Sequence, residues 1–451
     1  MKDNQDSSLP PAPVISPGPP ASQGPPDPAA PPDQEVPEAL RVPVERKGPI
    51  FIAGLLALSV ASMLTFLPLL SIIIPTQLTD MDPDSKVTWL GIIAGVGVLT
   101  GLVTSPIVGA LSDRTTSRFG RRRPWLIGGA VLTSIGYVLM MNAGSQMLLF
   151  LSYLFTGVSL SLITAVTAAI LPDQVPPEQR GTVSGMVGIA MPLAIIIGSV
   201  MCGNVLKTTI SRYVFVAVTV FAVVVLFALL FKDKPLPKGV VPKFKFVDIF
   251  KAFVFNPRKA PDFGWVWLAR AVMFFGYSLV GNYLLYYLQD VIHYERLFPG
   301  HTAAEGVATL QIYNTVLMVI ATVVGGILSD KLRRRRLFVV IASVIMAVSL
   351  AVIGLVPVWI ALVVANTAFG FGMGAYMAVD TALVTQCLPK QEDRGKDMGI
   401  LNIANNVPQA LAPMVAVPVI NLTHSYGFLY CAGGVMILAS IIFIGKIKGV
   451  R

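Results

Sequence analysis

The sequence predicts an all-α integral membrane protein with twelve transmembrane helices in two six-helix repeats. First, 54% of the 451 residues are apolar and 13% are charged, whereas soluble domains are about one quarter charged. Second, apolar stretches of about 20 residues, enough to cross ~30 Å of hydrocarbon, recur regularly after Lys47. Third, sequence elements are duplicated between the two halves. A soluble enzyme is therefore excluded, and three cysteines are too few for a disulfide scaffold.

Twelve apolar stretches are long enough to be spans. In the first half we expect them at 49–74, 88–111, 124–143, 147–171, 182–206 and 212–231. In the second half we expect them at 263–289, 304–328, 337–356, 359–388, 397–421 and 426–446. The Gly and Pro residues within them do not argue against helices, because membrane helices tolerate both.

The distribution of basic residues predicts the orientation. If both termini lie in the cytoplasm, the cytoplasmic segments hold 29 of the 34 Lys and Arg residues. This bias follows the positive-inside rule and predicts a multi-pass protein of the cell (cytoplasmic) membrane. It also accounts for the net charge of +10 without a nucleic-acid partner. The expected partners are the lipid bilayer and a small-molecule substrate, and we expect the chain to act as a monomer.

Composition and spacing divide the chain into four regions. Residues 1–47 contain thirteen prolines and form a Pro-rich cytoplasmic tail, which we expect to be disordered; a partner-binding motif is the alternative. Residues 48–231 form the N-terminal six-helix half and residues 263–451 the C-terminal half. The cytoplasmic loop 232–262 between them contains an amphipathic pattern at 246–253 that favours a helix on the inner membrane surface. A solvated linker is the alternative.

Two sequence elements occur twice, in the same order. Gly109-Ala-Leu-Ser-Asp113-Arg114 follows the second span, and Gly326-Ile-Leu-Ser-Asp330-Lys331 follows the eighth. Arg180-Gly181-x-x-x-Gly185 opens the fifth span, and Arg394-Gly395-x-x-x-Gly399 opens the eleventh. Two parallel six-helix halves related in this way are typical of secondary transporters.

The first of these loops carries a family resemblance. Together with Gly120-Arg121-Arg122 it resembles the signature loop of the major facilitator superfamily. The longer string at 111–124, Leu-Ser-Asp-Arg-Thr-Thr-Ser-Arg-Phe-Gly-Arg-Arg-Arg-Pro, is similar to that of sucrose/proton symporters and glycoside-type cation symporters. The resemblance implies the major facilitator fold.

A gate on the cytoplasmic side follows from these motifs. Gly109 is small enough to let two helices approach closely, and the Asp113 carboxylate can accept hydrogen bonds from a neighbouring helix N-terminus. The resemblance implies that this neighbour is the start of the eleventh span, and that Asp330 faces the fifth. The expected gate residues are Gly109, Asp113, Arg114, Arg121, Arg180, Asp330 and Arg394. The alternative is that the basic residues serve topology only, as we expect for Arg122, Arg123 and 333–336.

Two charged residues lie deep inside spans, where they are costly and mark functional positions. Arg270 and Asp380 are each about 10–12 Å from the cytoplasmic end of their helices, at 1.5 Å per residue. We therefore expect them to face each other. Three interpretations stay open: a fixed ion pair, an Asp380 that exchanges a proton while Arg270 responds to its charge, or substrate contact by Arg270.

The first span departs from the pattern of the plant sucrose symporters. Those proteins carry an acidic residue there for proton coupling, whereas residues 49–74 contain none. Asp380 is therefore the first candidate for proton coupling, and Asp290 is the second. If neither exchanges a proton, the protein is a uniporter or uses another ion.

Uncharged polar side chains within the spans predict a cavity for a neutral polyhydroxyl ligand. Amides can bond its hydroxyl groups, and aromatic rings can cover its C–H faces. The alternative for each residue is a hydrogen bond between helices. The expected cavity residues are Ser62, Thr65, Tyr277, Asn282, Tyr283, Gln311, Asn314, Tyr376, Asn402 and Asn405.

No enzyme, metal or nucleotide motif is present in the sequence. The three His residues do not cluster with Cys, and no Gly-x-x-x-x-Gly-Lys-Ser/Thr loop occurs. We expect no cofactor, with a proton gradient as the energy source. The predicted function is proton-coupled uptake of a sugar or glycoside by alternating access. The alternatives are efflux of amphipathic compounds by proton antiport, and a membrane solute sensor that does not transport.

Overall fold

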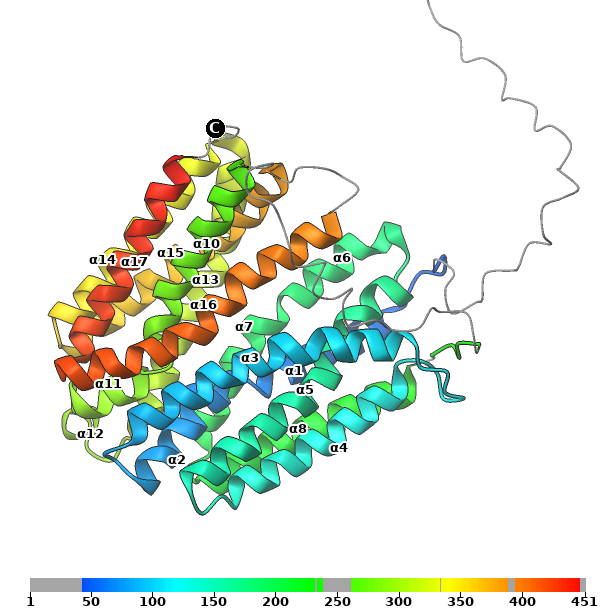
Figure 1. Cartoon of the computed structure of the whole chain (residues 1–451), viewed down its shortest axis with the longest axis horizontal. Helices are drawn as coiled ribbons and strands as arrows, with labels where there is room; N and C mark the ends of the chain where they lie inside the picture. Colours follow the sequence, from blue (N-terminus) through cyan, green and yellow to red (C-terminus); the bar gives the residue numbers. More distant parts are fainter. Residues whose placement is uncertain (1–42, 232, 238–260, 333, 388–393, 447–451) are drawn as a thin grey trace, which may run out of the picture. The chain divides into compact units, whose positions relative to one another are not determined.

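The computed structural model describes residues 43–231, 233–237, 261–332, 334–387 and 394–446, without the side chains of 330, 381–387 and 394–398. All regular elements in these ranges are helical (Figure 1). Twelve helical segments of the described chain are long and apolar enough to cross a membrane. The predicted fold class is therefore confirmed.

The first six spans are built from α1 to α8. They are α1 (Pro49–Leu64), η2 (Leu69–Ile73), α2 (Ile74–Met81), α3 (Lys86–Asp113), α4 (Arg123–Met141), α5 (Gln146–Gln174), α6 (Pro177–Gly188), α7 (Ala190–Ser199), η3 (Val200–Val205) and α8 (Thr209–Leu230). The second six are built from α10 (Pro261–Gly281), α11 (Leu284–Asp290), α12 (Tyr294–Leu297), α13 (Ala303–Leu332), α14 (Arg335–Leu355), α15 (Trp359–Cys387), α16 (Arg394–Thr423) and α17 (Tyr426–Gly445).

The first and the seventh spans differ most from the sequence-based prediction. The first span extends beyond residue 74 to Met81 through a π-helical turn, η2, and α2. The seventh is interrupted, because α10 ends at Gly281 and α11 begins at Leu284. At this break the buried Tyr283 hydroxyl donates to the Pro413 carbonyl of α16, 2.8 Å away. The interruption therefore lies at a contact between helices.

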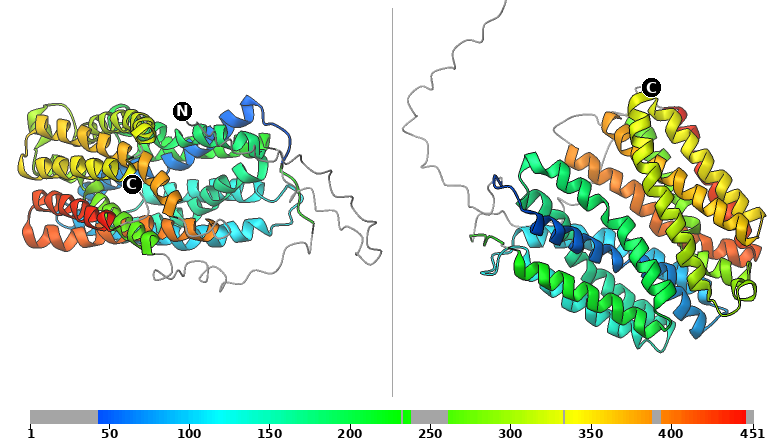
Figure 2. Two further views of the ribbon diagram at one scale, coloured as in Figure 1. Left: turned by 90° about the horizontal axis from the view of Figure 1, so that it is seen from above. Right: turned by 180° about the vertical axis from the view of Figure 1, so that it is seen from behind.

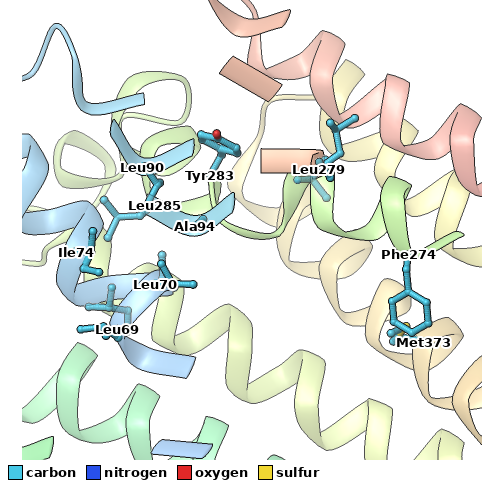
Figure 3. Packing of buried hydrophobic residues seen from close by; sticks show 14 of the residues in the cluster. Leu69, Leu70, Ile74, Leu90, Ala94, Phe274, Leu279, Tyr283, Leu285 and Met373 are labelled. Atoms are coloured by element: carbon cyan, nitrogen blue, oxygen red, sulfur yellow. The ribbon is translucent and has the colours of Figure 1, made fainter. Parts of the chain in front are cut away.

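Each half packs mainly within itself, and two seams join the halves. In the first half α4 packs against α5 and α8, and in the second α15 packs against α13 and α14. One seam is formed by α3 and α16, which lie side by side in Figure 1, and the other by α7 and α13. The views in Figure 2 show the same helices from above and from behind. Figure 3 shows Leu90 and Ala94 of α3 close to Tyr283 and Leu285, within one continuous buried cluster.

The tail and the central loop fall largely outside the described residues. Most of 1–47 and of 232–262, including the predicted amphipathic helix, is not described. The four-region division of the chain therefore stays a prediction.

Glycines in α15 allow it to contact the backbone of α13. A Cβ at Gly374 would collide with the Met318 carbonyl oxygen, and one at Gly370 with that of Asn314. A backbone neighbour cannot move aside as a flexible side chain can. These two positions therefore require glycine.

We predict that Gly374→Ala destabilises the protein by about 1–3 kcal/mol, the usual cost of overpacking. Gly326→Ala in α13 is the matched control, because its nearest neighbour, the Ala378 Cβ, would be 4.0 Å away. Thermal unfolding in detergent measures both. Equal stability of the two variants would contradict the close approach of α13 and α15.

Candidate functional site

The two sides of the helix bundle differ in charge. The basic side holds the loop between α3 and α4 and the N-terminus of α14, with arginines at 114–123 and 334–336. The opposite side holds the N-termini of α3, α8 and α17.

The opposite side is closed by an ion pair between the halves. Lys86 Nζ of α3 lies 2.8 Å from Asp290 Oδ1 of α11. The Tyr426 hydroxyl of α17 donates to Asp290 Oδ2 over 2.9 Å. Lys86 is only 8% exposed, and its ammonium group lies 4.9 Å from the centre of the Tyr286 ring. Asp290, the second candidate for proton coupling, is thus placed in a contact that holds the two halves together.

Further contacts close the same side along both seams. The Ser199 hydroxyl of α7 donates to Gln311 Oε1 of α13 over 2.7 Å. On the other seam, a Cβ at Gly91 or Gly95 of α3 would collide with side chains and backbone carbonyls of α16. Helix backbones therefore come close where α3 approaches the opposite side.

A cavity of about 530 Å³ lies between the halves. It is lined from α3 by Gly97, Val98, Gly101, Leu102, Ser105 and Pro106, from α5 by Tyr153, Thr156, Gly157, Leu160, Ser161 and Thr164, from the first span by Thr65, Phe66 and Leu69, and from α16 by Gly399, Asn402, Asn406 and Gln409. None of these lining residues is charged. Among the described residues, nothing lies within 4 Å of a Cβ built at Gly101, Gly181 or Gly185. The halves therefore separate toward the basic side, and the cavity opens there.

Five polar side chains of this lining make no hydrogen bond to another described residue: Ser105, Tyr153, Asn402, Asn406 and Gln409. A Cβ at Gly97 would collide with the Tyr153 ring, so this glycine gives the ring room against α3. The three amides follow each other at helical spacing and form one face of α16. The cavity thus presents two hydroxyls and three amides that are free to bind a ligand.

The structure places only two of the ten predicted cavity residues, Thr65 and Asn402, in this lining. The other residues contact protein groups or lie at the helix break. Four of them hydrogen-bond to protein groups: Ser62 donates to the Leu58 carbonyl, Gln311 accepts from Ser199, Asn314 donates to the Asn366 carbonyl, and Tyr283 donates to the Pro413 carbonyl. Tyr277 stacks on Phe369, and Asn282 is in the turn after α10. Tyr376 and Asn405 lie at the ion pair described next. Gln311, Asn314 and Asn405 form hydrogen bonds between helices, as the alternative describes, whereas Ser62 bonds within its own helix.

Sequence reasoning finds part of this lining and misses the residues of α5. Asn406 and Gln409 are among the polar residues that mark the cavity in the eleventh span, and they follow Asn402 at four and seven positions, so helical periodicity assigns all three to one face. Tyr153 gives no such signal, because it lies in an apolar helix among other aromatic residues.

Arg270 and Asp380 lie together, as their depths in the helices predict. Arg270 Nη1 is 3.0 Å from Asp380 Oδ2, with side chains 14% and 4% exposed. The angle of this contact does not make it a hydrogen bond, so Oδ2 has charge attraction but no aligned donor. Arg270 Nε donates to Asn405 Oδ1 over 2.6 Å, and the Tyr376 hydroxyl also bonds the Asp380 carboxylate. The pair lies outside the cavity lining, with α16 contributing to both sites.

On the basic side, the signature loop is bound to its own half of the protein. Asp173 Oδ2, near the end of α5, accepts from Arg121 Nη2 at 2.6 Å and from Arg122 Nη2 at 2.8 Å. Arg122 also lies 2.6 Å from Asp113 Oδ1 and donates to the Ser112 hydroxyl. The expectation that Arg122 serves topology only is therefore wrong, because it is 3% exposed and joins three elements. Asp173 was missed, although its place after Leu171-Pro172 in a repeated motif was a signal.

The gate across the halves stays a prediction. The close helix contact expected at Gly109 is absent, since nothing described lies within 4 Å of a Cβ there. Asp113 contacts Arg122 of its own half, because α3 and α16 diverge on this side. Arg114 donates to the Ala110 carbonyl, and Arg180 donates to the Val175 and Pro172 carbonyls. The side chains of Asp330 and Arg394 lie outside the described residues.

Asp233, just after α8, caps the N-terminus of α4. Its Oδ2 accepts from the backbone N–H groups of Arg122 and Arg123, which have no partner within the helix. Burial raises the pKa of Asp233, whereas these two hydrogen bonds and the charges of Arg121 and Arg122 act in the opposite direction. The cap attaches the signature loop to the end of the sixth span.

We predict that Asp173→Asn lowers the stability of the protein by up to about 3 kcal/mol, because it leaves two buried guanidinium groups with less compensating charge. Asp113→Asn is the control and should cost less than about 1 kcal/mol, since the Asp113 side chain is 50% exposed. Thermal unfolding in detergent compares them. A larger loss for Asp113→Asn would show that Asp113, rather than Asp173, balances the charge of Arg122.

Comparison with known proteins gives one family and several partial relatives. The family model described as Major Facilitator Superfamily matches residues 50–313 and 301–448. A sucrose transport protein of Arabidopsis thaliana is 46% identical over 55 residues, which are 12% of this chain and 11% of that protein. The general alpha-glucoside permease of Schizosaccharomyces pombe is 28% identical over 130 residues, 24% of each chain.

A third relative is named for drug resistance rather than for sugar transport. Multidrug resistance protein 3 of Bacillus subtilis is 30% identical over 132 residues, 29% of this chain and 24% of that protein. The matches to these three relatives thus span a quarter of their length or less. Among solved structures, the bacterial homolog of the human lysosomal transporter Spinster, in an inward-facing and occupied conformation, superposes with a TM-score of 0.65. It is 15% identical, covering 89% of this chain and 96% of its own, and shows the fold alone.

Proposed function

Since this chain belongs to the Major Facilitator Superfamily of membrane transporters, we propose that it takes up a neutral sugar or glycoside together with a proton. The observation that carries the proposal is the cavity between the halves. Its lining has no charged side chain and presents two hydroxyls, of Ser105 and Tyr153, and three amides without a protein hydrogen bond. Such a site suits a neutral, hydroxyl-rich ligand better than a lipophilic cation, which would favour a buried carboxylate or more aromatic faces.

Transport then proceeds by alternating access. The basic side is assigned to the cytoplasm by the positive-inside rule, so the described conformation is open to the cell interior. Return to the outside requires the Lys86–Asp290 pair to separate and the basic side to close. A proton gradient supplies the energy, and no cofactor is needed.

Asp380 is the proposed proton carrier. It is buried and its Oδ2 has no aligned hydrogen-bond donor, so the charge of Arg270 is its main compensation. Moving Arg270 away would leave a carboxylate that is stable in the membrane only when protonated. A change in this distance during transport therefore links proton uptake to conformation.

The first test is substrate-induced proton flux in proteoliposomes. We expect sucrose, maltose or an aryl glycoside to make the external medium alkaline, because the sugar and the proton enter together. Lipophilic cations form the comparison set. If sugars cause no pH change and a lipophilic cation causes proton exchange, efflux by antiport replaces this proposal.

The second test is Asp380→Asn. The variant should still exchange labelled sugar across the membrane but lose accumulation driven by a pH gradient, because its amide takes up no proton. The double variant Arg270→Gln/Asp380→Asn guards against misfolding from an unpaired arginine. Asp290→Asn tests the second candidate, and a loss of coupling in this variant alone would move the proton site to Asp290.

A further inference from the structure

Asn405 joins the ion pair to the helix that carries the substrate amides. Its Oδ1 accepts from Arg270 Nε over 2.6 Å, and Arg270 Nη1 lies 3.0 Å from Asp380 Oδ2. Asn402, Asn406 and Gln409 line the cavity from the same helix, α16. At 3.6 residues per turn, Asn405 lies about a fifth of a turn from the middle of that face. One helix therefore contacts both the cavity and the guanidinium group.

Hydrogen bonds attach α16 to α10 and to the turn before α11 on both sides of Asn405. Trp267 Nε1 donates to the Ile400 carbonyl over 2.9 Å, and the Tyr283 hydroxyl donates to the Pro413 carbonyl over 2.8 Å. Both bonds are to backbone. Between them the bond to α10 is made by the Asn405 side chain. Pro408 and Pro413 interrupt the helix hydrogen bonds here, and such positions bend at lower cost.

Few groups act on the charge of Asp380. From α10, Arg270 faces it, and from its own helix Tyr376 hydrogen-bonds it. The described parts of α13 and α14, which pack against α15, contribute no charged group to this contact. The position of Arg270 therefore decides whether the carboxylate is compensated.

We propose that Asn405 is a positioning residue that couples occupancy of the cavity to proton uptake at Asp380. A sugar drawn to Asn402, Asn406 and Gln409 pulls the middle of α16 toward the cavity. Asn405 moves with it and withdraws Arg270 from Asp380, whose carboxylate then accepts a proton from water. This mechanism rests on the proposed function, because it assumes that sugar and proton move together.

The experiment reads the protonation of Asp380 directly. Dicyclohexylcarbodiimide reacts with protonated carboxyl groups in apolar surroundings, and mass spectrometry quantifies its adduct at Asp380 as a function of pH. In the wild-type protein, saturating sucrose should raise the pH of half-labelling by about one unit, a tenfold coupling typical of linked sites. In Asn405→Ala the sucrose-induced shift should be lost, while sucrose still protects the protein against thermal unfolding.

Two further variants make the result specific. Asn405→Leu nearly conserves the side-chain volume and should also lose the sucrose-induced shift. It replaces the alanine variant in the experiment if that variant unfolds. Asn406→Ala, the adjacent asparagine in the cavity lining, should weaken sucrose binding but keep the full shift once sucrose saturates.

Two outcomes would contradict the proposed role of Asn405, and they can be distinguished. A wild-type shift in both Asn405 variants would overturn the positioning role and leave the proposed function standing. A wild-type protein that transports sucrose without any shift at Asp380 would overturn proton coupling at this residue, and the role of Asn405 with it.

Discussion

The contact of α3 with α16 at Gly91 and Gly95 is the constraint on which the rest of the structure depends. A Cβ at either glycine would collide with α16, including the carbonyl oxygens of Pro413 and Ala410, so the helix backbones come close here. Beyond this contact, Gly101 meets nothing within 4 Å and the cavity begins. The position of two residues without side chains thus determines where the halves close, on which side they open, and where a ligand can bind.

The second organising feature is the separation of charge from the cavity. An ion pair within the cavity would be exposed to water and ions whenever that side opened. Placed behind α16, Arg270 and Asp380 are 14% and 4% exposed, and their attraction stays strong in the low dielectric of the helix bundle. The cavity can then select by hydrogen bonding alone. The helix α16 contributes side chains to both sites, because Asn402 lines the cavity and Asn405 accepts from Arg270.

The sequence predicted the helices and the depth of buried charges better than it predicted their surroundings. Spans follow from the length of apolar stretches, and the meeting of Arg270 with Asp380 follows from counting residues along two helices. The cavity lining depends on how each helix is rotated. Since lipid-facing and protein-facing sides are both apolar in a membrane, hydropathy does not report this rotation. Gln311 and Asn314 were therefore expected in a cavity and instead bond to α7 and α15.

The prolines of α16 have one more consequence, which concerns water. Pro413 has no N–H group, so the Gln409 carbonyl lacks its usual partner within the helix, and Gln409 belongs to the wall of the cavity. Water that fills the open cavity can bond to this carbonyl and wet the helix backbone from inside. The polar surface of the cavity therefore includes helix backbone as well as the side-chain amides of α16.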